Sequence, residues 1–342
     1  MKVLSGILIL GAVVIFILVA LIIGKSLYTS KSSSSNLPVN SHPLMIEEMR
    51  KKHYEGGAID LVEKVGDYDG FKSYIIAYPS ENLRLFALMN VPTREVPEGG
   101  FPIIILNHGF ISPRSYSTIN SYKDDAKFYA QNGFVVIKPD YRGHDNSEGR
   151  DESGHYSPYY TYDVLNLVAS IKKLALKTQS SPLTLINPEK IGMWGHSMGG
   201  QITLRSLVIS SDIKAAVLFA GVVASAYDLY YSWPERFTKP IWASDSGRQR
   251  LPQEFGTPKE NPLFWDKVSA INYVDFVTAP IQIHHGEKDQ VVPIEFSEKL
   301  LKILQEKGKQ VEFFRYPGDD HGLSNNHDLF LQRTLEFFKV SL

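Results

Sequence analysis

Six short apolar runs, spread over the chain from residue 101 onward, constrain its fold more than any other feature. They read FPIIILNH, FVVIKPD, KIGMWGH, AAVLFAG, PIQIHHG and VEFFRYPG. Nearly continuous apolar segments of this length are typical of strands that are covered on both faces. Helix-length stretches lie between most of them, at 115–132, 159–177, 198–210 and 294–308. This alternation predicts an α/β fold with a mostly parallel central sheet, right-handed crossovers and helices on both faces.

Two further strands and a short helix are expected before these runs. The segments FKSYIIAYPS and LRLFALMNVP are apolar or alternating, and we expect these strands to break at Pro79 and Pro92. The preceding segment PLMIEEMRKK predicts a short helix.

The stretch 222–280 is much too long for a single crossover between two strands. It is rich in aromatic residues, namely Tyr227, Tyr230, Tyr231, Trp233, Trp242, Phe255, Phe264 and Trp265. Long insertions of this kind often form lids or binding elements. We therefore expect a cap or lid at about 222–280, with Tyr227, Tyr231 and Trp233 as candidate substrate-binding residues. The alternative is a helical insertion whose aromatic side chains only pack on the body of the domain.

The N-terminal region has the composition of a membrane anchor. No charged residue occurs from Val3 to Gly24, and a helix needs about 20 apolar residues to cross a bilayer. Apolar residues occupy every face of this stretch, which argues against a core helix, and a cleaved signal peptide is the other alternative. We expect a single-pass transmembrane anchor at 1–28, a flexible Ser-rich linker at 29–43 and a folded domain at 44–342. Lysines flank the apolar stretch on both sides, and we expect the domain to lie outside the cytoplasm.

The remaining composition excludes several classes of function. The formal net charge of −1 gives no electrostatic reason to expect a nucleic-acid partner. The absence of cysteine rules out disulfides, thiolate metal sites and a cysteine nucleophile. Neither a zinc-binding H-E-x-x-H pattern nor a G-x-G-x-x-G or Walker pattern is present. We therefore expect no metal and no cofactor, while the oligomeric state stays open.

The segment IGMWGHSMGGQITLRS joins an apolar run to a helix-like stretch through a glycine-rich turn. A serine at the tip of a sharp strand-to-helix turn leaves no space for side chains at the flanking positions, and Gly195 and Gly199 satisfy this requirement. Such a turn lifts the hydroxyl of Ser197 into the crevice beyond the carboxyl ends of the strands. It also places the backbone N–H of Met198 at a helix N-terminus, where it can stabilise an oxyanion.

A serine nucleophile needs a base to take its proton and an acid to orient the base. In folds with this turn the chain order is Ser, then Asp or Glu, then His. Asp289 in HHGEKDQVVP and His321 in YPGDDHGLS both follow expected strands and fit this order. Glu287 and Asp319 are the alternative acids. Among the other histidines, we expect His284 and His285 to make local hydrogen bonds and His196 to be a packing residue.

Two other loops follow expected strands. The loop NHGFIS should supply a second oxyanion donor, for which we favour the backbone N–H of Phe110 over that of Gly109. In the segment PDYRGHDNSEG, Asp140 and Arg142 could bind substrate, but we favour a polar clamp that fixes the loop.

With NHGF, DYRGHDNSEG, GHSMGG, HHGEKDQVVP and DDHGL in this order, the chain from about residue 55 to its end resembles the α/β-hydrolase superfamily. Within it, the chain is similar to the catalytic domain of prolyl oligopeptidase family serine peptidases. The resemblance implies that 44–342 is an α/β-hydrolase domain, with Ser197 as nucleophile, Asp289 as orienting acid and His321 as general base. It also implies that the backbone N–H groups of Met198 and Phe110 are the oxyanion donors.

The resemblance implies a serine hydrolase that cleaves peptide or ester bonds through an acyl-enzyme. Oligopeptidases of the family usually carry a β-propeller, and no repeat of propeller period occurs in this sequence. The choice between a peptidase and a carboxylesterase therefore stays open. A non-catalytic, hydrolase-like binding module is a further alternative.

Overall fold

The computed structural model describes residues 41–152, 154–174, 181–233 and 246–342. The contacts divide the chain into two units, Met1–Asn40 and Ser41–Leu342, and the description below concerns the second. The predicted anchor and most of the predicted linker therefore lie outside the described residues. Within the described ranges, no helix is long and apolar enough to span a bilayer.

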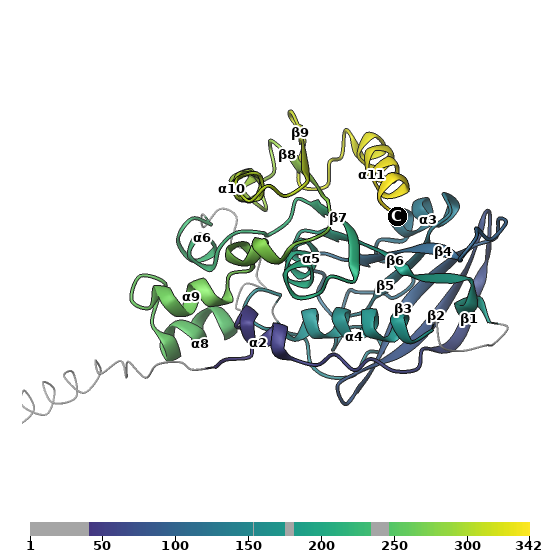
Figure 1. Cartoon of the computed structure of the whole chain (residues 1–342), viewed down its shortest axis with the longest axis horizontal. Coiled ribbons are helices and arrows are strands. Elements are labelled where there is room, and N and C mark those ends of the chain that lie inside the picture. Colours follow the sequence, from purple (N-terminus) through teal and green to yellow (C-terminus); the bar gives the residue numbers. More distant parts are fainter. Residues whose placement is uncertain (1–40, 153, 175–180, 234–245) are drawn as a thin grey trace, which may run out of the picture. The chain divides into compact units, whose positions relative to one another are not determined.

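The described residues contain one sheet of nine strands, in the order β1-β2-β3-β5-β4-β6-β7-β8-β9 (Figure 1). Neighbouring strands from β1 to β5 in this order pair antiparallel, and all the others pair parallel. The predicted mostly parallel sheet is thus confirmed. The strands are β1 (Asp60–Tyr68), β2 (Phe71–Ser80), β3 (Leu83–Pro92), β4 (Phe101–Asn107), β5 (Val135–Pro139), β6 (Ile186–His196), β7 (Ile213–Phe219), β8 (Ile281–Gly286) and β9 (Val311–Tyr316).

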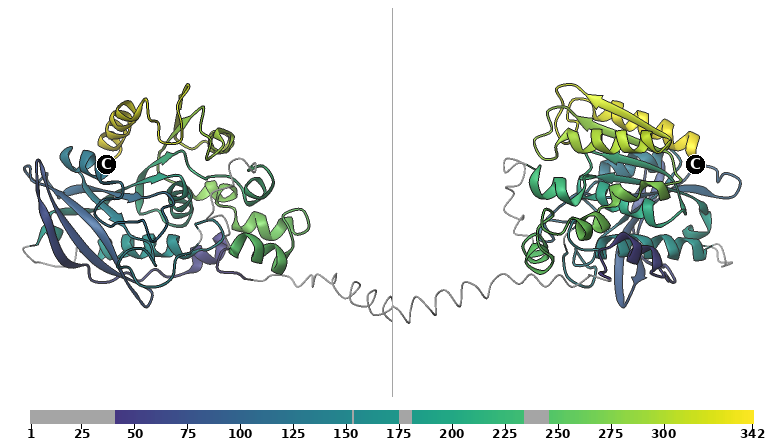
Figure 2. Two further views of the ribbon diagram at one scale, coloured as in Figure 1. Left: turned by 180° about the vertical axis from the view of Figure 1, so that it is seen from behind. Right: turned by 60° about the vertical axis from the view of Figure 1, so that its left-hand side comes forward.

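Helices cover both faces of this sheet (Figures 1 and 2). Along β4, Ile103 and Ile105 point into one core and Ile104 and Leu106 into the other, because successive side chains of a strand alternate between its faces. The first core includes side chains of α4, α5 and α10, and the second those of α3 and α11. The helices are α2 (Ile46–Lys51), α3 (Lys123–Gln131), α4 (Tyr159–Leu174), α5 (Met198–Ile209), α6 (Ala226–Tyr231), α8 (Ser246–Phe255), α9 (Pro262–Val268), α10 (Ile294–Glu306) and α11 (His327–Ser341), with 3-10 turns η1 (Pro182–Leu185) and η2 (Ala270–Phe276).

Two predictions about individual elements are wrong. The stretch 115–132 was expected to be one helix, but α3 begins only at Lys123. Thr118 is held by the side chains of Asp140 and Asp145, so residues ahead of α3 form a loop that follows these partners. The expected break at Pro79 is also absent, because β2 continues through Pro79 to Ser80.

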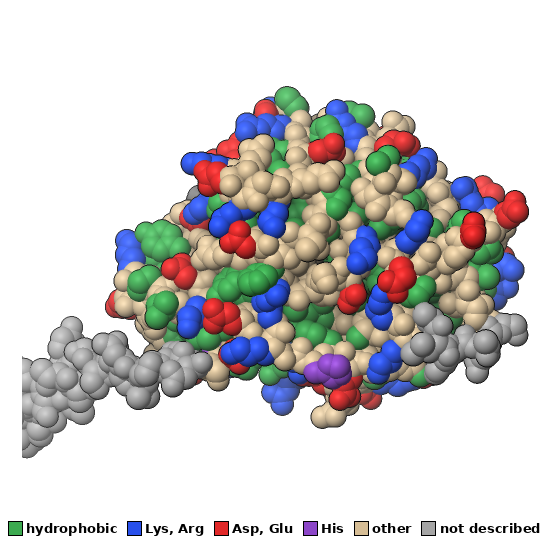
Figure 3. All heavy atoms as spheres, viewed as in Figure 1, with side chains coloured by type: hydrophobic (Ala, Val, Ile, Leu, Met, Phe, Trp, Pro, Cys, Tyr) green, Lys and Arg blue, Asp and Glu red, His purple; other side chains and the backbone are tan. Residues whose placement is uncertain are grey.

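The expected cap corresponds to the segment between β7 and β8, and its described part is helical. It contains α6, α8, α9 and η2. Its aromatic residues differ in burial: Phe264 and Trp265 are buried, whereas Tyr227 and Tyr231 are exposed at 43% and 38%. Packing on the body thus accounts for part of the aromatic content, and Trp242 lies outside the described residues. On the face seen in Figure 3, side chains of both charge signs are interspersed, as the net charge of −1 suggests.

Candidate active site

Ser197 occupies a strained turn between β6 and α5. Its backbone has φ 54° and ψ −118°, a region that residues other than glycine rarely adopt. Three backbone hydrogen bonds fix the turn: the Ser197 N–H donates to Phe219 O (2.9 Å), and the Ser197 carbonyl accepts from Gly200 N (3.0 Å) and Val222 N (3.1 Å). The end of β7 and the start of the following loop therefore hold the serine in place.

The two glycines that flank this serine are required by close approach of the backbone. A Cβ added to Gly199 would overlap the carbonyl oxygen of Asn107, at the end of β4. A Cβ added to Gly195 would overlap Gly199 O and the Thr203 hydroxyl. Gly199 thus lets the turn pack against β4, and Gly195 lets β6 pack against α5.

Asp289 and His321 lie on the loops that follow the neighbouring strands β8 and β9. The His321 Nδ1 is 2.7 Å from Asp289 Oδ2. The other carboxylate oxygen, Oδ1, accepts from the backbone N–H groups of Val291 (2.7 Å) and Val292 (2.9 Å). The acid and the imidazole are thus joined, and the acid is anchored by its own loop.

His285 also contacts this carboxylate, a contact that the sequence analysis did not predict. Its Nε2 is 3.1 Å from Asp289 Oδ2 and its Nδ1 is 2.8 Å from Ser297 Oγ. Burial alone would raise the pKa of Asp289, but hydrogen bonds from His285 and His321 outweigh it and hold the pKa well below its usual value. Asp289 is therefore ionised at neutral pH. A histidine four residues before the acid, at the end of a buried strand, is the only sequence signal of this contact.

The alternative acids are placed elsewhere. Asp319 is buried and accepts hydrogen bonds from Asn325 and Asn326 within the same loop. Glu287 is exposed. His284 bonds to Gln282 and Tyr316 inside the core, as a local role implies.

The loop after β4 lies against the serine. A Cβ built on Gly109 would be 3.2 Å from Ser197 Cβ. The Gly109 N–H donates to the Tyr122 hydroxyl at 3.0 Å, and Phe110 follows directly. On the other side, Met198 is the first residue of α5, where a backbone N–H has no partner within the helix. Met198 thus lies at the turn itself, and Phe110 is next in sequence to a residue that approaches the turn.

In the described part of the chain, no hydrogen bond joins the Ser197 hydroxyl to His321. The imidazole of His321 nevertheless reaches the turn, since its ring centroid is 4.7 Å from that of His196, the residue before Ser197. Contacts between nucleophile and base are often long in enzymes until substrate binds. Ser197, Asp289 and His321 thus follow the carboxyl ends of the parallel strands β6, β8 and β9, on the same side of the sheet.

Asp140 and Arg142 form part of a buried polar clamp. This is the role that the sequence analysis favoured over substrate binding. The Arg142 guanidinium contacts both oxygens of Asp163 on α4, at 2.6 to 3.1 Å. Asp140 accepts from the hydroxyls of Tyr116 (2.6 Å) and Thr118 (2.5 Å). These contacts tie the loop after β5 to α4 and to the segment before α3.

The three candidate substrate-binding residues are not equivalent. Trp233 lies beside the loop after β8 that carries Asp289, because its indole N–H donates to Val291 O at 3.0 Å. Tyr227 and Tyr231 stand together on α6 with ring centroids 4.8 Å apart, and Lys259 lies 4.6 Å over the Tyr231 ring. Only Trp233 contacts a loop that carries a candidate catalytic residue.

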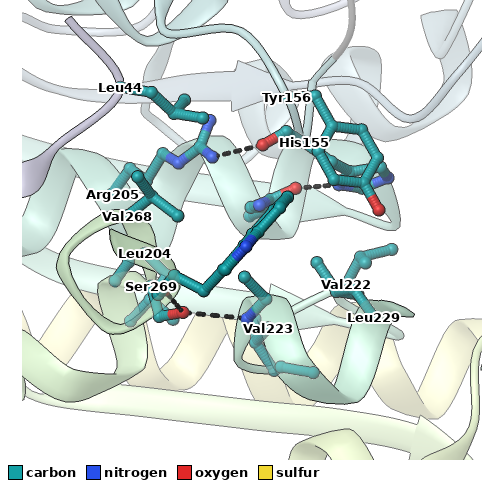
Figure 4. Close-up of a pocket in the computed structure, with 15 residues that line it drawn as sticks. Leu44, His155, Tyr156, Leu204, Arg205, Val222, Val223, Leu229, Val268 and Ser269 are labelled. Carbon is teal, nitrogen blue, oxygen red and sulfur yellow. Dashed lines mark hydrogen bonds between the residues drawn. The ribbon is translucent and has the colours of Figure 1, made fainter. Parts of the chain in front are cut away.

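A small pocket opens between α5 and the cap (Figure 4). Its walls are mostly apolar and include Val222, Leu229 and Val268. Arg205 on α5 is buried at its edge and points to the segment before α4, where it donates to the carbonyls of Gly154, His155 and Ser157 at 2.6 to 2.9 Å. Burial lowers the pKa of Arg205 to about 10.

Comparisons with known proteins show which family the chain matches. The family model described as "Prolyl oligopeptidase family" matches residues 120–342, more than half of the chain. The uncharacterized peptidase YtmA of Bacillus subtilis (strain 168) is 25% identical over 254 residues, which cover 72% of this chain and 85% of that protein.

Two solved structures share the fold. The acetyl xylan esterase from Paenibacillus sp. R4 superposes with a TM-score of 0.63 at 16% identity, covering 85% of this chain and 91% of that one. The Pyrococcus horikoshii acylaminoacyl peptidase superposes with a TM-score of 0.60 at 23% identity, covering 80% of this chain but only 44% of that longer chain. These neighbours establish the α/β-hydrolase fold, and on the family match the chain belongs to the prolyl oligopeptidase family.

Proposed function

We propose that this protein is a serine hydrolase that cleaves peptide or ester bonds through an acyl-enzyme on Ser197. The observation that carries the proposal is the 2.7 Å contact between His321 Nδ1 and Asp289 Oδ2, on loops at the carboxyl ends of the parallel strands, where the strained turn also places Ser197. Membership of the prolyl oligopeptidase family, the similarity to a peptidase and the structural similarity to an esterase support a hydrolase of peptidase or esterase type.

The imidazole is oriented for base catalysis. Because Asp289 is ionised, it accepts the Nδ1–H of His321 and leaves Nε2 with a lone pair. That nitrogen takes the Ser197 proton as Oγ attacks the substrate carbonyl, and the carboxylate stabilises the resulting imidazolium.

The oxyanion that forms on the substrate accepts hydrogen bonds from the backbone N–H groups of Met198 and Phe110. Collapse of this intermediate breaks the bond to the leaving group, which takes the proton from His321, and the acyl group stays on Ser197. Water then attacks the ester with the same base, and the carboxylic acid product leaves.

The test of this proposal is labelling of the full-length chain with a fluorophosphonate probe. We expect one label on Ser197, none in Ser197→Ala, and a turnover number at least about a thousand-fold lower in that variant. Ser206→Ala is the matched control, because Ser206 lies on α5 but its hydroxyl bonds only to Ile202 O. A wild-type chain that does not label, or a Ser197→Ala chain that labels equally, would overturn the proposal.

Peptide and ester substrates remain the two candidate classes. The acetyl xylan esterase, of which this chain covers 91%, supports an ester substrate, and the peptidase YtmA, of which it covers 85%, supports a peptide. We propose that Trp233, beside the loop of Asp289, contacts the acyl group or the residue before the cleaved bond, with Tyr227 and Tyr231 further out on the cap. Rates on p-nitrophenyl esters against aminoacyl and prolyl anilides, measured for wild type and Trp233→Ala, separate the two classes and test this contact.

We also propose that residues 1–28 anchor the enzyme to a membrane with the domain outside the cytoplasm. The uncharged stretch from Val3 to Gly24 supports this proposal. Carbonate extraction of membranes from cells that express the full chain is the test. A full chain that carbonate releases as readily as a version without residues 1–28 would contradict an anchor.

A further inference from the structure

Tyr122 and His196 connect the loop after β4 with the loop after β9. The Gly109 N–H lies 3.0 Å from the Tyr122 hydroxyl, and that hydroxyl lies 2.6 Å from His196 Nδ1. The other ring nitrogen of His196 lies 3.2 Å from the backbone carbonyl of His321. These three contacts form an unbroken chain from the candidate oxyanion loop to the candidate base.

The chemistry of the groups fixes the direction of every hydrogen bond. A backbone N–H only donates, so Tyr122 Oη accepts from Gly109. A carbonyl only accepts, so His196 Nε2 carries a proton and donates to His321 O. Burial of the imidazole and the nearby His321 lower the pKa of His196 to about 3. In the neutral ring Nδ1 is therefore a bare acceptor, and it takes the one proton of the Tyr122 hydroxyl.

The backbone of Tyr122 is strained in a way that serves this arrangement. It has φ 55° and ψ 26° just before α3, a left-handed conformation that is uncommon for a bulky residue. Such strain persists where surrounding contacts determine it, and it gathers at functional sites. The ring contacts Trp194 edge-on at 6.0 Å and His196 at 5.8 Å, so the strained turn aims the hydroxyl between the two loops.

We propose that Tyr122 and His196 are positioning residues, which hold the Gly109–Phe110 loop and His321 in the relative geometry that attack by Ser197 requires. This inference rests on the proposed function. Neither side chain exchanges a proton with substrate. Each keeps a loop in place, and the loops belong to strands, β4 and β9, that are not neighbours in the sheet.

The test compares Tyr122, the residue before the first turn of α3, with Tyr129, which lies within α3. Tyr122→Phe removes only the hydroxyl, and we expect kcat to fall about 10- to 100-fold while KM changes less than about threefold. Tyr129→Phe is the control: its buried hydroxyl lies 2.6 Å from Thr334 Oγ1 on α11 and also reaches Trp194, but no hydrogen bond joins it to Gly109 or His196. It should lose comparable stability but keep kcat within about twofold. If Tyr122 acted only through overall stability, Tyr122→Phe and Tyr129→Phe would change kcat to the same extent.

A second measurement tests the hydrogen bonds that link Gly109, Tyr122, His196 and His321 without measuring activity. Long-range proton–nitrogen NMR of the histidine-labelled protein should show His196 as the neutral, Nε2-protonated tautomer from pH 5 to pH 8. A charged or Nδ1-protonated His196 overturns the inference, as does wild-type kcat in Tyr122→Phe. A wild-type chain that fails to label with fluorophosphonate instead overturns the proposed function, and this inference with it.

Discussion

At the scale of single residues, backbone strain and close approach shape the candidate site. Ser197 and Tyr122 both adopt a positive φ without being glycine. Each such residue destabilises the fold by about 1 to 3 kcal/mol. The hydrogen bonds around both residues, from β7, the loop after β4 and His196, maintain these conformations. The stability of the turn therefore depends on contacts with several other strands.

Replacing one of the flanking glycines should disrupt this arrangement. In Gly199→Ala the new methyl group overlaps the Asn107 carbonyl, which belongs to β4 and cannot move without the sheet. We expect a loss of about 3 kcal/mol or more in the free energy of unfolding, measured by urea titration. Gly322→Ala is the control, because its added carbon would lie no closer than 3.7 Å to Asp320 Oδ1. Equal stability of the two variants would show that the turn tolerates a side chain.

Sequence reasoning could propose Ser197, Asp289 and His321 because each carries a local signal: a glycine-rich turn, or a polar residue on the loop that follows an apolar run. It could not find Tyr122, which lies inside a stretch that has the pattern of a helix. The role of Tyr122 comes from contacts with Gly109 and His196, made in the folded chain. Those contacts leave no periodic trace in the sequence.

At the scale of secondary-structure elements, a buried ion pair fixes the loop between β5 and α4. The side chain of Asp163 on α4 is fully buried and that of Arg142 is 8% exposed. Asp163 also accepts from the Ser80 hydroxyl of β2 at 2.8 Å. One carboxylate therefore joins a helix, a loop and a strand of the antiparallel part of the sheet.

Removing this carboxylate should be far more destabilising than removing an exposed one. In Asp163→Ala the Arg142 charge stays buried with only Glu81 nearby, and we expect a loss of about 3 to 5 kcal/mol in unfolding free energy. Glu189→Ala breaks the exposed pair with Lys172, in which Glu189 is 67% exposed, and should change stability by less than about 0.5 kcal/mol. Urea unfolding measures both. Similar losses in the two variants would contradict a special role for the buried pair.

Elements were predictable where burial imposes a clear pattern. The six apolar runs are all strands, because both faces of the central sheet are covered by helices. The edge strand β1, with sequence DLVEKVGDY, was missed because most of its residues are exposed and its pairing with β2 is interrupted by two register shifts. Residues 115–122 were wrongly predicted to be helical. Their local pattern favours a helix, but the contacts of Thr118 with Asp140 and Asp145 hold them in a loop instead.

At the scale of the whole molecule, buried neutral histidines make the fold sensitive to acid. His284 lies in the second core between Phe314 and Phe330, and burial, with Arg333 nearby, holds its pKa well below the usual value. Below about pH 6.5 the unfolded chain binds a proton at this residue that the folded chain does not. The stability that His284 contributes is therefore present above pH 6.5 and is lost as the pH falls toward the folded pKa.

Removing this imidazole should flatten the response to acid. From pH 7 to pH 5, the unfolding free energy of His284→Leu should fall about 2 kcal/mol less than that of wild type, although the variant is less stable at pH 7. His53→Gln, at an exposed residue, should match the wild-type slope. Urea titrations at several pH values measure these free energies. If the unfolding free energies of wild type and His284→Leu changed in parallel with pH, protonation of His284 would not cause the loss of stability in acid.

The place of β9 at the end of the sheet has a consequence for how this enzyme would fail. It is hydrogen-bonded to β8 alone and most of its residues are only partly covered, and such peripheral strands open at lower free energy than central ones. His321 follows β9, whereas Ser197 follows β6 in the middle of the sheet. On the proposed mechanism, mild heating should therefore abolish activity by displacing the imidazole of His321, while most of the helical circular-dichroism signal persists, and cooling should restore the activity.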